Sequence, residues 1–211
     1  MRFRFLAHIF ASTFAVLVCP GLHAEKPADR VPPQQAVSTV HPLATDAALA
    51  AYASGGNAVD AAIAAALTLG VVDGHNSGIG GGCFILIRAA DGTFTAIDGR
   101  ETAPAAAHRD MYLIDGKLDE KASKTGALAS GIPGALASYE LALTKHGRKT
   151  LASLLDPAAA LAAEGFPIDD IYARKLASVR DDIAGFPSSA SIFLKPDGSA
   201  LKQGDILVQT D

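Results

Sequence analysis

Small and apolar residues recur at helical spacing in the first half of the chain. Leu43, Ala47 and Ala50 fall on one face, Pro42 suits a first helical position, and the glycines at 55–56 end the pattern. This pattern predicts a helix that begins near residue 42.

A second helix is predicted directly afterwards. Asn57 can cap it with Asp60 three residues further on, and Val59, Ile63 and Leu67 form its large apolar stripe. Most of the other positions up to residue 66 are alanine, so this helix can approach a neighbouring layer closely.

The next segment predicts a β-hairpin. Residues 83–88 (CFILIR) are too apolar for a half-exposed strand and indicate one buried on both faces. Asp91-Gly92 is a strong turn signal, and residues 94–97 return antiparallel. Arg100 follows at the end of the return strand.

Further helices are expected in the second half. One opens at Pro133 and closes at Gly147, a second runs from Asp156-Pro157 to Gly165, and a charged one spans 168–184. Turns are expected at 115–116 and 196–198, and residues 204–209 predict the start of another element.

The N-terminus has the pattern of an export signal. Arg2 and Arg4 precede an apolar stretch from Phe5 to Val18, and residues 22–24 (LHA) offer a small-residue cleavage site. A lipoprotein signal at Cys19 is a weaker alternative because the bulky Val18 precedes it. A buried helix fits less well, since the chain is proline-rich after it. We expect a signal peptide over 1–24, a flexible lead-in over 25–40 and one folded region over 41–211.

Charge and cysteine content narrow the function classes. Loss of Arg2 and Arg4 would change the formal net charge from −4 to −6, which gives no support to a nucleic-acid partner. Only Cys83 would remain after cleavage, so no internal disulfide is expected. The longest later apolar run, 61–72, is too short to cross a bilayer. We therefore expect a periplasmic or secreted protein with no membrane partner.

The glycines at 78 and 80–82 do not fit a nucleotide site. Cys83 stands where a dinucleotide fingerprint needs its last glycine, and the cluster precedes a strand instead of following one. Positive φ angles or close backbone approach explain these glycines better.

Other common sites are also poorly supported. Four widely spaced histidines (41, 75, 108 and 146) predict no metal site and are expected mostly at the surface. No Gly-x-Ser-x-Gly elbow occurs, and Ser188, Ser189 and Ser191 fit a linker or helix cap. We expect neither a metal nor another cofactor.

Arg100 is the candidate site residue. Taken alone, it fits a surface guanidinium paired with Asp98 or Glu101. Its place beyond a strand end, beside the glycine cluster, also suits a fork of N–H donors held rigidly against a small anion.

Five collinear motifs give the chain a more specific character. They are GGNAVDAAIAAALTLGVVDGHNSGIGGGCFILI at 55–87, DGRETAPAAAHRDMY at 98–112, GALASGIPGALASYELAL at 126–143, AEGFPI at 163–168 and LKQGDILVQ at 201–209. With these motifs in this order, the chain resembles the gamma-glutamyltranspeptidase family of N-terminal nucleophile hydrolases, which transfer or hydrolyse the gamma-glutamyl group of glutathione.

The resemblance carries implications for fold, site and partners. It implies an α+β fold, the αββα sandwich, of which this chain supplies the N-terminal portion of a large subunit. It implies that Arg100 binds the α-carboxylate of the glutamyl substrate, and that a small subunit from the same precursor is the partner. The family's catalytic threonine begins that small subunit and lies beyond this chain, so no catalytic residue is assigned here.

Two departures and two alternatives accompany the resemblance. Asp73-Gly74-His75 replaces a proline-containing sequence that is common in the family, and Cys83 stands where a further glycine is usual. The resemblance therefore does not predict the backbone path of the glycine loop. The same fold also serves cephalosporin acylases and poly-gamma-glutamate enzymes. A non-catalytic remnant is the alternative from another class, and the downstream coding sequence would distinguish it.

Overall fold

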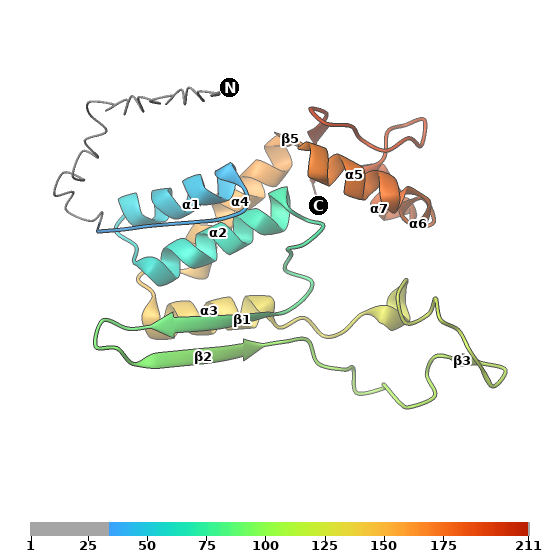
Figure 1. Ribbon diagram of the computed structural model, residues 1–211, viewed down its shortest axis with the longest axis horizontal. Coiled ribbons are helices and arrows are strands. Elements are labelled where there is room, and N and C mark those ends of the chain that lie inside the picture. Colours follow the sequence, from blue (N-terminus) through green and yellow to red (C-terminus); the bar gives the residue numbers. More distant parts are fainter. Residues whose placement is uncertain (1–33, 211) are drawn as a thin grey trace, which may run out of the picture. The chain divides into compact units, whose positions relative to one another are not determined.

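The computed structural model describes residues 34–210, which form one compact unit from residue 35 onward (Figure 1). The expected signal peptide and most of the expected lead-in therefore lie outside the described residues. Within the lead-in, residues 35–40 form no regular secondary structure, and Val37 packs against the helical core.

The first two helices begin where they were predicted to begin, and the first ends before the glycines at 55–56 as expected. Helix α1 spans Pro42–Ala53, where Nδ1 of His41 accepts from the Leu43 amide at 3.2 Å, and α2 spans Ala58–Val72. The Asn57 side chain and Asp60 form a reciprocal capping box at the start of α2. The predicted cap is confirmed.

Asp60 does more than cap its own helix. It is completely buried and accepts backbone N–H bonds from Asn57 at 2.7 Å, and from Arg148 and Lys149 at 2.9 Å each. The amide of Asn57 also donates to the carbonyl of His146 at 2.7 Å. The start of α2 is thereby fixed to a segment almost ninety positions later.

The predicted hairpin is present. Strand β1 spans Cys83–Arg88 and pairs antiparallel with β2, Phe94–Gly99, with Cys83 opposite Gly99 and Arg88 opposite Phe94. The expectation that β1 is buried on both faces is wrong for the described residues. Ile85 and Ile87 pack inward on the helices, whereas Phe84 and Leu86 are 72% and 71% exposed.

Helices α3 and α4 complete the helical layer, and one predicted boundary is wrong. Helix α3 spans Ala135–His146, close to the prediction, but α4 spans Leu151–Glu164 and so begins before the predicted Asp156-Pro157. Thr150 caps it by accepting from the Ser153 amide at 3.3 Å. Pro157 lies inside the helix, where burial of Leu154 and Ala158 offsets the lost hydrogen bond.

Residues 100–134 form a loop-rich arm between the hairpin and α3. It contains the two-residue strands β3 (Leu113–Ile114) and β4 (Lys117–Leu118), joined by the predicted turn at Asp115-Gly116, and the short 3-10 helix η1 (Ala127–Ala129). Both turn residues have positive φ angles, 51° and 74°.

The C-terminal part differs from its prediction in two places. The charged segment forms two helices, α5 (Asp170–Ser178) and α6 (Arg180–Ala184), because Val179 leaves helical geometry with ψ of 13°. Ser188, Ser189 and Ser191 lie within α7 (Pro187–Phe193), where a linker or a helix cap was expected; the N-cap position is Phe186. Strand β5 (Phe166–Pro167) pairs with β6 (Ile206–Leu207), which confirms the element expected near residue 206.

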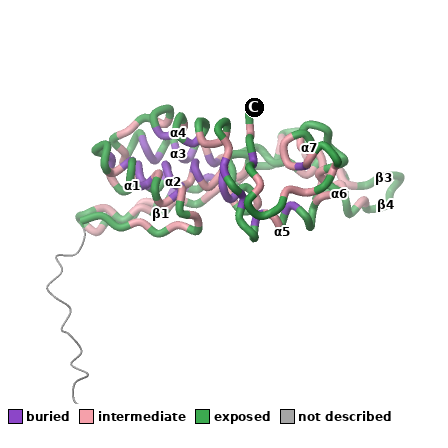
Figure 2. The backbone as a smooth tube through the Cα atoms, turned by 90° about the horizontal axis from the view of Figure 1, so that it is seen from above, coloured by how far each residue is buried: buried purple, intermediate pink, exposed green. Residues whose placement is uncertain are grey.

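Two apolar clusters hold these elements together. The larger joins α1, α2, α3 and α4 to the inner face of the hairpin, and the smaller surrounds Phe166, Tyr172 and Leu207 (Figure 2). None of the described helices is long and apolar enough to cross a membrane.

Candidate functional site

Three of the sequence motifs meet around Arg100. The carbonyl of Gly81, in the glycine loop, accepts from the amides of Gly134 at 3.1 Å and Ala135 at 3.2 Å, at the start of α3. Thr102, just after Arg100, exchanges backbone hydrogen bonds with Ile132 at 3.2 and 2.8 Å. Segments separated by more than fifty residues are thus fixed to one another by main-chain bonds.

The side chain of Arg100 is held on one side and open on the other. Its Nη2 lies 3.3 Å from Oε2 of Glu101, and its Cζ lies 5.9 Å from the centre of the Phe84 ring. The backbone amide of Arg100 donates to Oδ1 of Asp98 at 3.0 Å, which ties down the strand end. The side chain is 58% exposed, so guanidinium donors remain for a ligand.

Arg100 and the glycine loop line one hollow of about 620 Å³. Its other lining residues come from the end of α2, the turn after it, the segment after β2, and α3. They include Leu69, His75, Asn76, Glu101 and Tyr139. Sequence reasoning placed Arg100 beside the glycine cluster, and the structure brings the two together. Pairing with Glu101, the alternative considered for an isolated arginine, occurs as well.

The glycines fulfil one of the two roles expected for them. None of the glycines at 78 and 80–82 has a positive φ, so that part of the expectation is wrong. Close approach is confirmed at Gly82, where an added Cβ would lie 2.5 Å from the carbonyl oxygen of Gly99 and 2.8 Å from Cα of Arg100. Gly82 therefore lets the loop pass directly against the chain that carries Arg100.

The turn at 73–77 is ordered by Asp73. This carboxylate is buried and accepts from Asn76 Nδ2 at 3.1 Å and Ser77 Oγ at 3.4 Å, while Nε2 of His75 lies 3.2 Å from it. The ring of His75 packs edge-on against Tyr172 at 5.2 Å. The residues that depart from the family pattern thus form their own hydrogen-bonded turn at one wall of the hollow.

Cys83 and Tyr139 contribute neutral groups to the hollow. Burial raises the pKa of the Cys83 thiol, and the Glu101 carboxylate acts in the same direction, although a hydrogen bond from Ser138 opposes them. Burial also raises the pKa of Tyr139. Cys83 is therefore unsuited to act as a nucleophile, which requires the thiolate.

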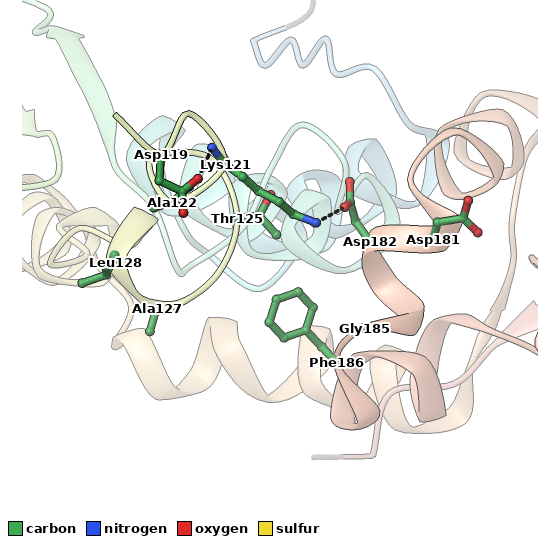
Figure 3. Close-up of a pocket in the computed structure, with 10 residues that line it drawn as sticks. All are labelled: Asp119, Lys121, Ala122, Thr125, Ala127, Leu128, Asp181, Asp182, Gly185 and Phe186. Carbon is green, nitrogen blue, oxygen red and sulfur yellow. Dashed lines mark hydrogen bonds and ion pairs between the residues drawn. The ribbon is translucent and has the colours of Figure 1, made fainter. Parts of the chain in front are cut away.

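A second hollow, of about 530 Å³, lies between the arm and α6 (Figure 3). Phe186 forms part of its wall, and Lys121 of the arm pairs across it with Asp182 at 3.6 Å. It shares no lining residue with the Arg100 hollow. Residues 34–210 contain no group of three or more His, Cys, Asp or Glu side chains placed to hold a metal ion.

Sequence reasoning missed two walls of the Arg100 hollow. His75 and Tyr139 were interpreted as a surface group and a helix-stripe residue, yet both line it. Of the four histidines expected mostly at the surface, only His108 is exposed, and the other three are half-buried. The available signal for His75 was its position between an apolar helix and the glycine cluster.

Comparisons with known proteins agree with this architecture. The model of the family described as Gamma-glutamyltranspeptidase matches residues 44–211. The glutathione hydrolase proenzyme of Escherichia coli is 43% identical over 180 residues, which cover 84% of this chain and 31% of that protein. The chain thus spans about a third of this curated relative.

Solved structures give the same result. The gamma-glutamyltranspeptidase of Helicobacter pylori matches with a TM-score of 0.78 and 37% identity, over 84% of this chain and 52% of that one. A cephalosporin acylase from Bacillus halodurans matches with a TM-score of 0.67 and 25% identity, over 84% of this chain and 36% of that one.

The fold is therefore part of the α+β architecture of N-terminal nucleophile hydrolases, as predicted. Within that class, the chain belongs to the gamma-glutamyltranspeptidase family, which is a family of enzymes.

Proposed function

We propose that the complete protein hydrolyses or transfers the gamma-glutamyl group of glutathione and related gamma-glutamyl amides. Arg100 binds the α-carboxylate of the glutamyl group through its guanidinium. One observation supports this above the others: Arg100 is half-exposed in a hollow where three family motifs meet, with only one nitrogen engaged by Glu101.

The reaction needs groups from the rest of the proenzyme. A threonine hydroxyl attacks the γ-carbonyl carbon, its proton passes to the leaving amine, and a gamma-glutamyl ester forms. Water or an acceptor amine then attacks the ester and releases the threonine. Arg100 takes no part in bond making; it holds the substrate so that its carbonyl meets the nucleophile.

A substitution of Arg100 in the complete proenzyme tests the proposed role. Arg100→Ala should lower kcat/KM for a gamma-glutamyl anilide by about 100- to 1000-fold, mainly through KM, because an anchoring charge pair is lost. Arg100→Lys should keep part of the activity, since a lysine offers one charge without the planar fork. Arg88, exposed at the far end of the same hairpin, provides the control Arg88→Ala.

A second substrate separates carboxylate binding from general damage. A 4-aminobutyryl anilide has the same amide and amine but no α-carboxylate. If Arg100 binds that carboxylate, wild type and Arg100→Ala should hydrolyse this anilide equally slowly. Equal kcat/KM values of the two proteins for the gamma-glutamyl anilide would contradict the proposal.

A related acylase is the second candidate, favoured by the structural likeness to the cephalosporin acylase. Arg100 suits any acyl group that ends in a free carboxylate, so it does not choose between gamma-glutamyl and glutaryl amides. Comparing kcat/KM for these two amides decides between the candidates. Faster turnover of the glutaryl amide would favour the acylase.

Export is part of the same proposal. The pattern over residues 1–24 is that of a cleaved signal peptide, with the mature chain beginning near Glu25 and located in the periplasm or outside the cell. N-terminal sequencing of the mature protein tests it, and an intact Met1 would contradict it.

A further inference from the structure

The outer face of the β1–β2 hairpin carries Phe84 and Arg100 together. Exposure alternates along both strands, and Ile85 and Ile97 contact the helical core from the inner face. Phe84, Asp98 and Arg100 are exposed on the opposite face. Phe84 is paired with Asp98 across the ladder, and Arg100 follows two positions later. Phe84 and Arg100 are therefore diagonal neighbours on one face, a spacing that aromatic and long side chains can bridge.

The Phe84 ring contacts the charge of Arg100 and not the apolar clusters of the described residues. The side chain is 72% exposed and belongs to neither cluster. The guanidinium carbon Cζ of Arg100 lies over the ring, 5.9 Å from its centre. This distance is within the range of a cation–π interaction, in which the negative ring face attracts the cation.

Glu101 and Phe84 hold the guanidinium in different ways. Oε2 of Glu101 lies 3.3 Å from Nη2, so this carboxylate engages a nitrogen that a ligand could also use. A ring face attracts the guanidinium through its charge and accepts none of the N–H bonds that lie in the guanidinium plane. Phe84 can therefore fix the orientation of the guanidinium while the remaining donors stay available to a carboxylate.

We propose that Phe84 is a positioning residue for Arg100: its ring holds the guanidinium in the orientation in which the planar fork meets the substrate carboxylate. The proposal rests on the proposed function, because it concerns the carboxylate that Arg100 is proposed to bind. A long side chain loses rotamer freedom when it binds a ligand, and a ring that already restricts the guanidinium lowers this cost. Phe84 should therefore affect substrate binding more than the turnover of the bound substrate.

Removal of the ring in the complete proenzyme tests the proposal. Phe84→Leu keeps an apolar side chain but loses the ring face, so KM for a gamma-glutamyl anilide should rise by about 5- to 30-fold, with kcat changed by less than about twofold. Phe84→Tyr keeps the ring and should keep KM within about twofold of the wild type. Phe94 is 65% exposed at the far end of the hairpin and provides the control Phe94→Leu, which should leave KM unchanged. Equal effects of the two leucine substitutions would overturn the proposal.

A second substrate separates positioning from damage to the fold. The 4-aminobutyryl anilide has no carboxylate for Arg100 to bind, so Phe84→Leu should leave its kcat/KM at the wild-type value. In an Arg100→Ala background, adding Phe84→Leu should lower kcat/KM for the gamma-glutamyl anilide by less than about twofold, because no guanidinium is left to position. An equal loss with both substrates, or an undiminished loss in the double variant, would overturn the proposal.

Fluorination of the ring provides a variant with little change in shape. Fluorine withdraws electron density from the ring face and so weakens its attraction for a cation, whereas the ring keeps nearly the same size. With a ring-trifluorinated phenylalanine in place of Phe84, KM for the gamma-glutamyl anilide should rise by at least about twofold. An unchanged KM would overturn the proposal, even if Phe84→Leu failed to fold.

The same series of variants separates this proposal from the proposed function. If Arg100→Ala lowers kcat/KM for the gamma-glutamyl anilide and Phe84→Leu does not, the positioning role is refuted and the function stands. If the wild type hydrolyses a glutaryl anilide but not the gamma-glutamyl anilide, the gamma-glutamyl function is refuted. The positioning role is then decided by the KM of Phe84→Leu for the glutaryl anilide, whose free carboxylate Arg100 can also bind: a rise supports it, and an unchanged value overturns it.

Discussion

The surroundings of Asp60 and Arg100 show two ways of placing a charge. Asp60 is fully buried in the helical layer, and its carboxylate accepts backbone bonds from Asn57, Arg148 and Lys149. Arg100 lies at the end of β2, 58% exposed, with one nitrogen near Glu101 and Phe84 beneath its guanidinium. The first charge is satisfied within the chain, and the second keeps donors free.

The comparison of Asp60 with Arg100 indicates that different regions of this small unit provide its stability and its candidate site. The Asp60 carboxylate is hydrogen-bonded to three backbone N–H groups and is fully buried, so it is not available to a ligand. Around Arg100, the side chains of Phe84 and Leu86 are exposed, and the guanidinium is paired with Glu101 through only one nitrogen. The helical layer packs against the inner face of the hairpin and holds it in place. The exposed side chains of the hairpin region, Phe84, Leu86 and Arg100, take no part in that packing.

The largest effect is expected from the buried carboxylate. Asp60→Ala removes a fully buried carboxylate and leaves the backbone N–H groups of Asn57, Arg148 and Lys149 without their acceptor, so the free energy of unfolding should fall by about 3–5 kcal/mol. Urea denaturation followed by circular dichroism measures it. Asp46→Ala, on the exposed side of α1, is the control and should leave the urea midpoint unchanged. If the urea midpoint of Asp60→Ala equalled that of Asp46→Ala, the buried carboxylate would not stabilise the helical layer, and the contrast with Arg100 would not hold.

A smaller loss is expected where the two regions touch. A Cβ on Gly99 would collide with Oγ and Cβ of Ser138 on α3, so Gly99→Ala should cost about 1–3 kcal/mol of stability. Gly80→Ala, where an added Cβ meets nothing within 4 Å, is the matched control and should be neutral or slightly stabilising. Adding Ser138→Gly should recover part of the loss. No recovery in the double variant would mean that the strain lies elsewhere.

Alkaline pH should weaken the smaller apolar cluster. Burial, together with the Asp73 carboxylate, raises the pKa of Tyr172 to about 12. The folded pKa exceeds the unfolded value of about 10, so this contribution to stability is complete below pH 10 and is lost as the pH rises towards 12. Urea midpoints at pH 9 and 11 should differ less in Tyr172→Phe than in the wild type. The difference between the two midpoints that remains in Tyr172→Phe includes the contribution of Tyr139, whose pKa is also raised by burial. An unchanged difference would place the titration in another group.

The smallest effect is expected at the arm. Lys121 and Asp182 are 73% and 56% exposed and 3.6 Å apart, so Lys121→Ala should change the free energy of unfolding by less than about 0.5 kcal/mol. Thermal unfolding with and without added salt measures it. A loss above about 1 kcal/mol would show that the arm is bound to α6 by more than this pair.

Local signals predicted the capped helices and the hairpin, because Asn57, Asp60 and Asp91-Gly92 determine structure within a few residues of themselves. The start of α4 at Leu151 was missed, because the burial of Leu154 and Ala158 outweighs the helix hydrogen bond that Pro157 cannot make. The exposure of Phe84 and Leu86 could not be predicted from the composition of β1, because a uniformly apolar run is typical of a strand buried on both faces. Arg100 was found from its motif. Tyr139 reaches the same hollow only through tertiary packing, and no local pattern marks it. For His75 the one available signal was its position between an apolar helix and the glycine cluster.

The bonds of Asp60 also constrain the order in which the chain can fold. Its acceptors are filled by amides 88 and 89 positions later, so the cap of α2 is completed only after residue 149 has been synthesised and has returned to the first helices. Until then the carboxylate must stay hydrated, which opposes its enclosure by α1 and α2. Contacts of such long sequence separation slow folding, and they make the helical layer form as one cooperative event instead of helix by helix during translation.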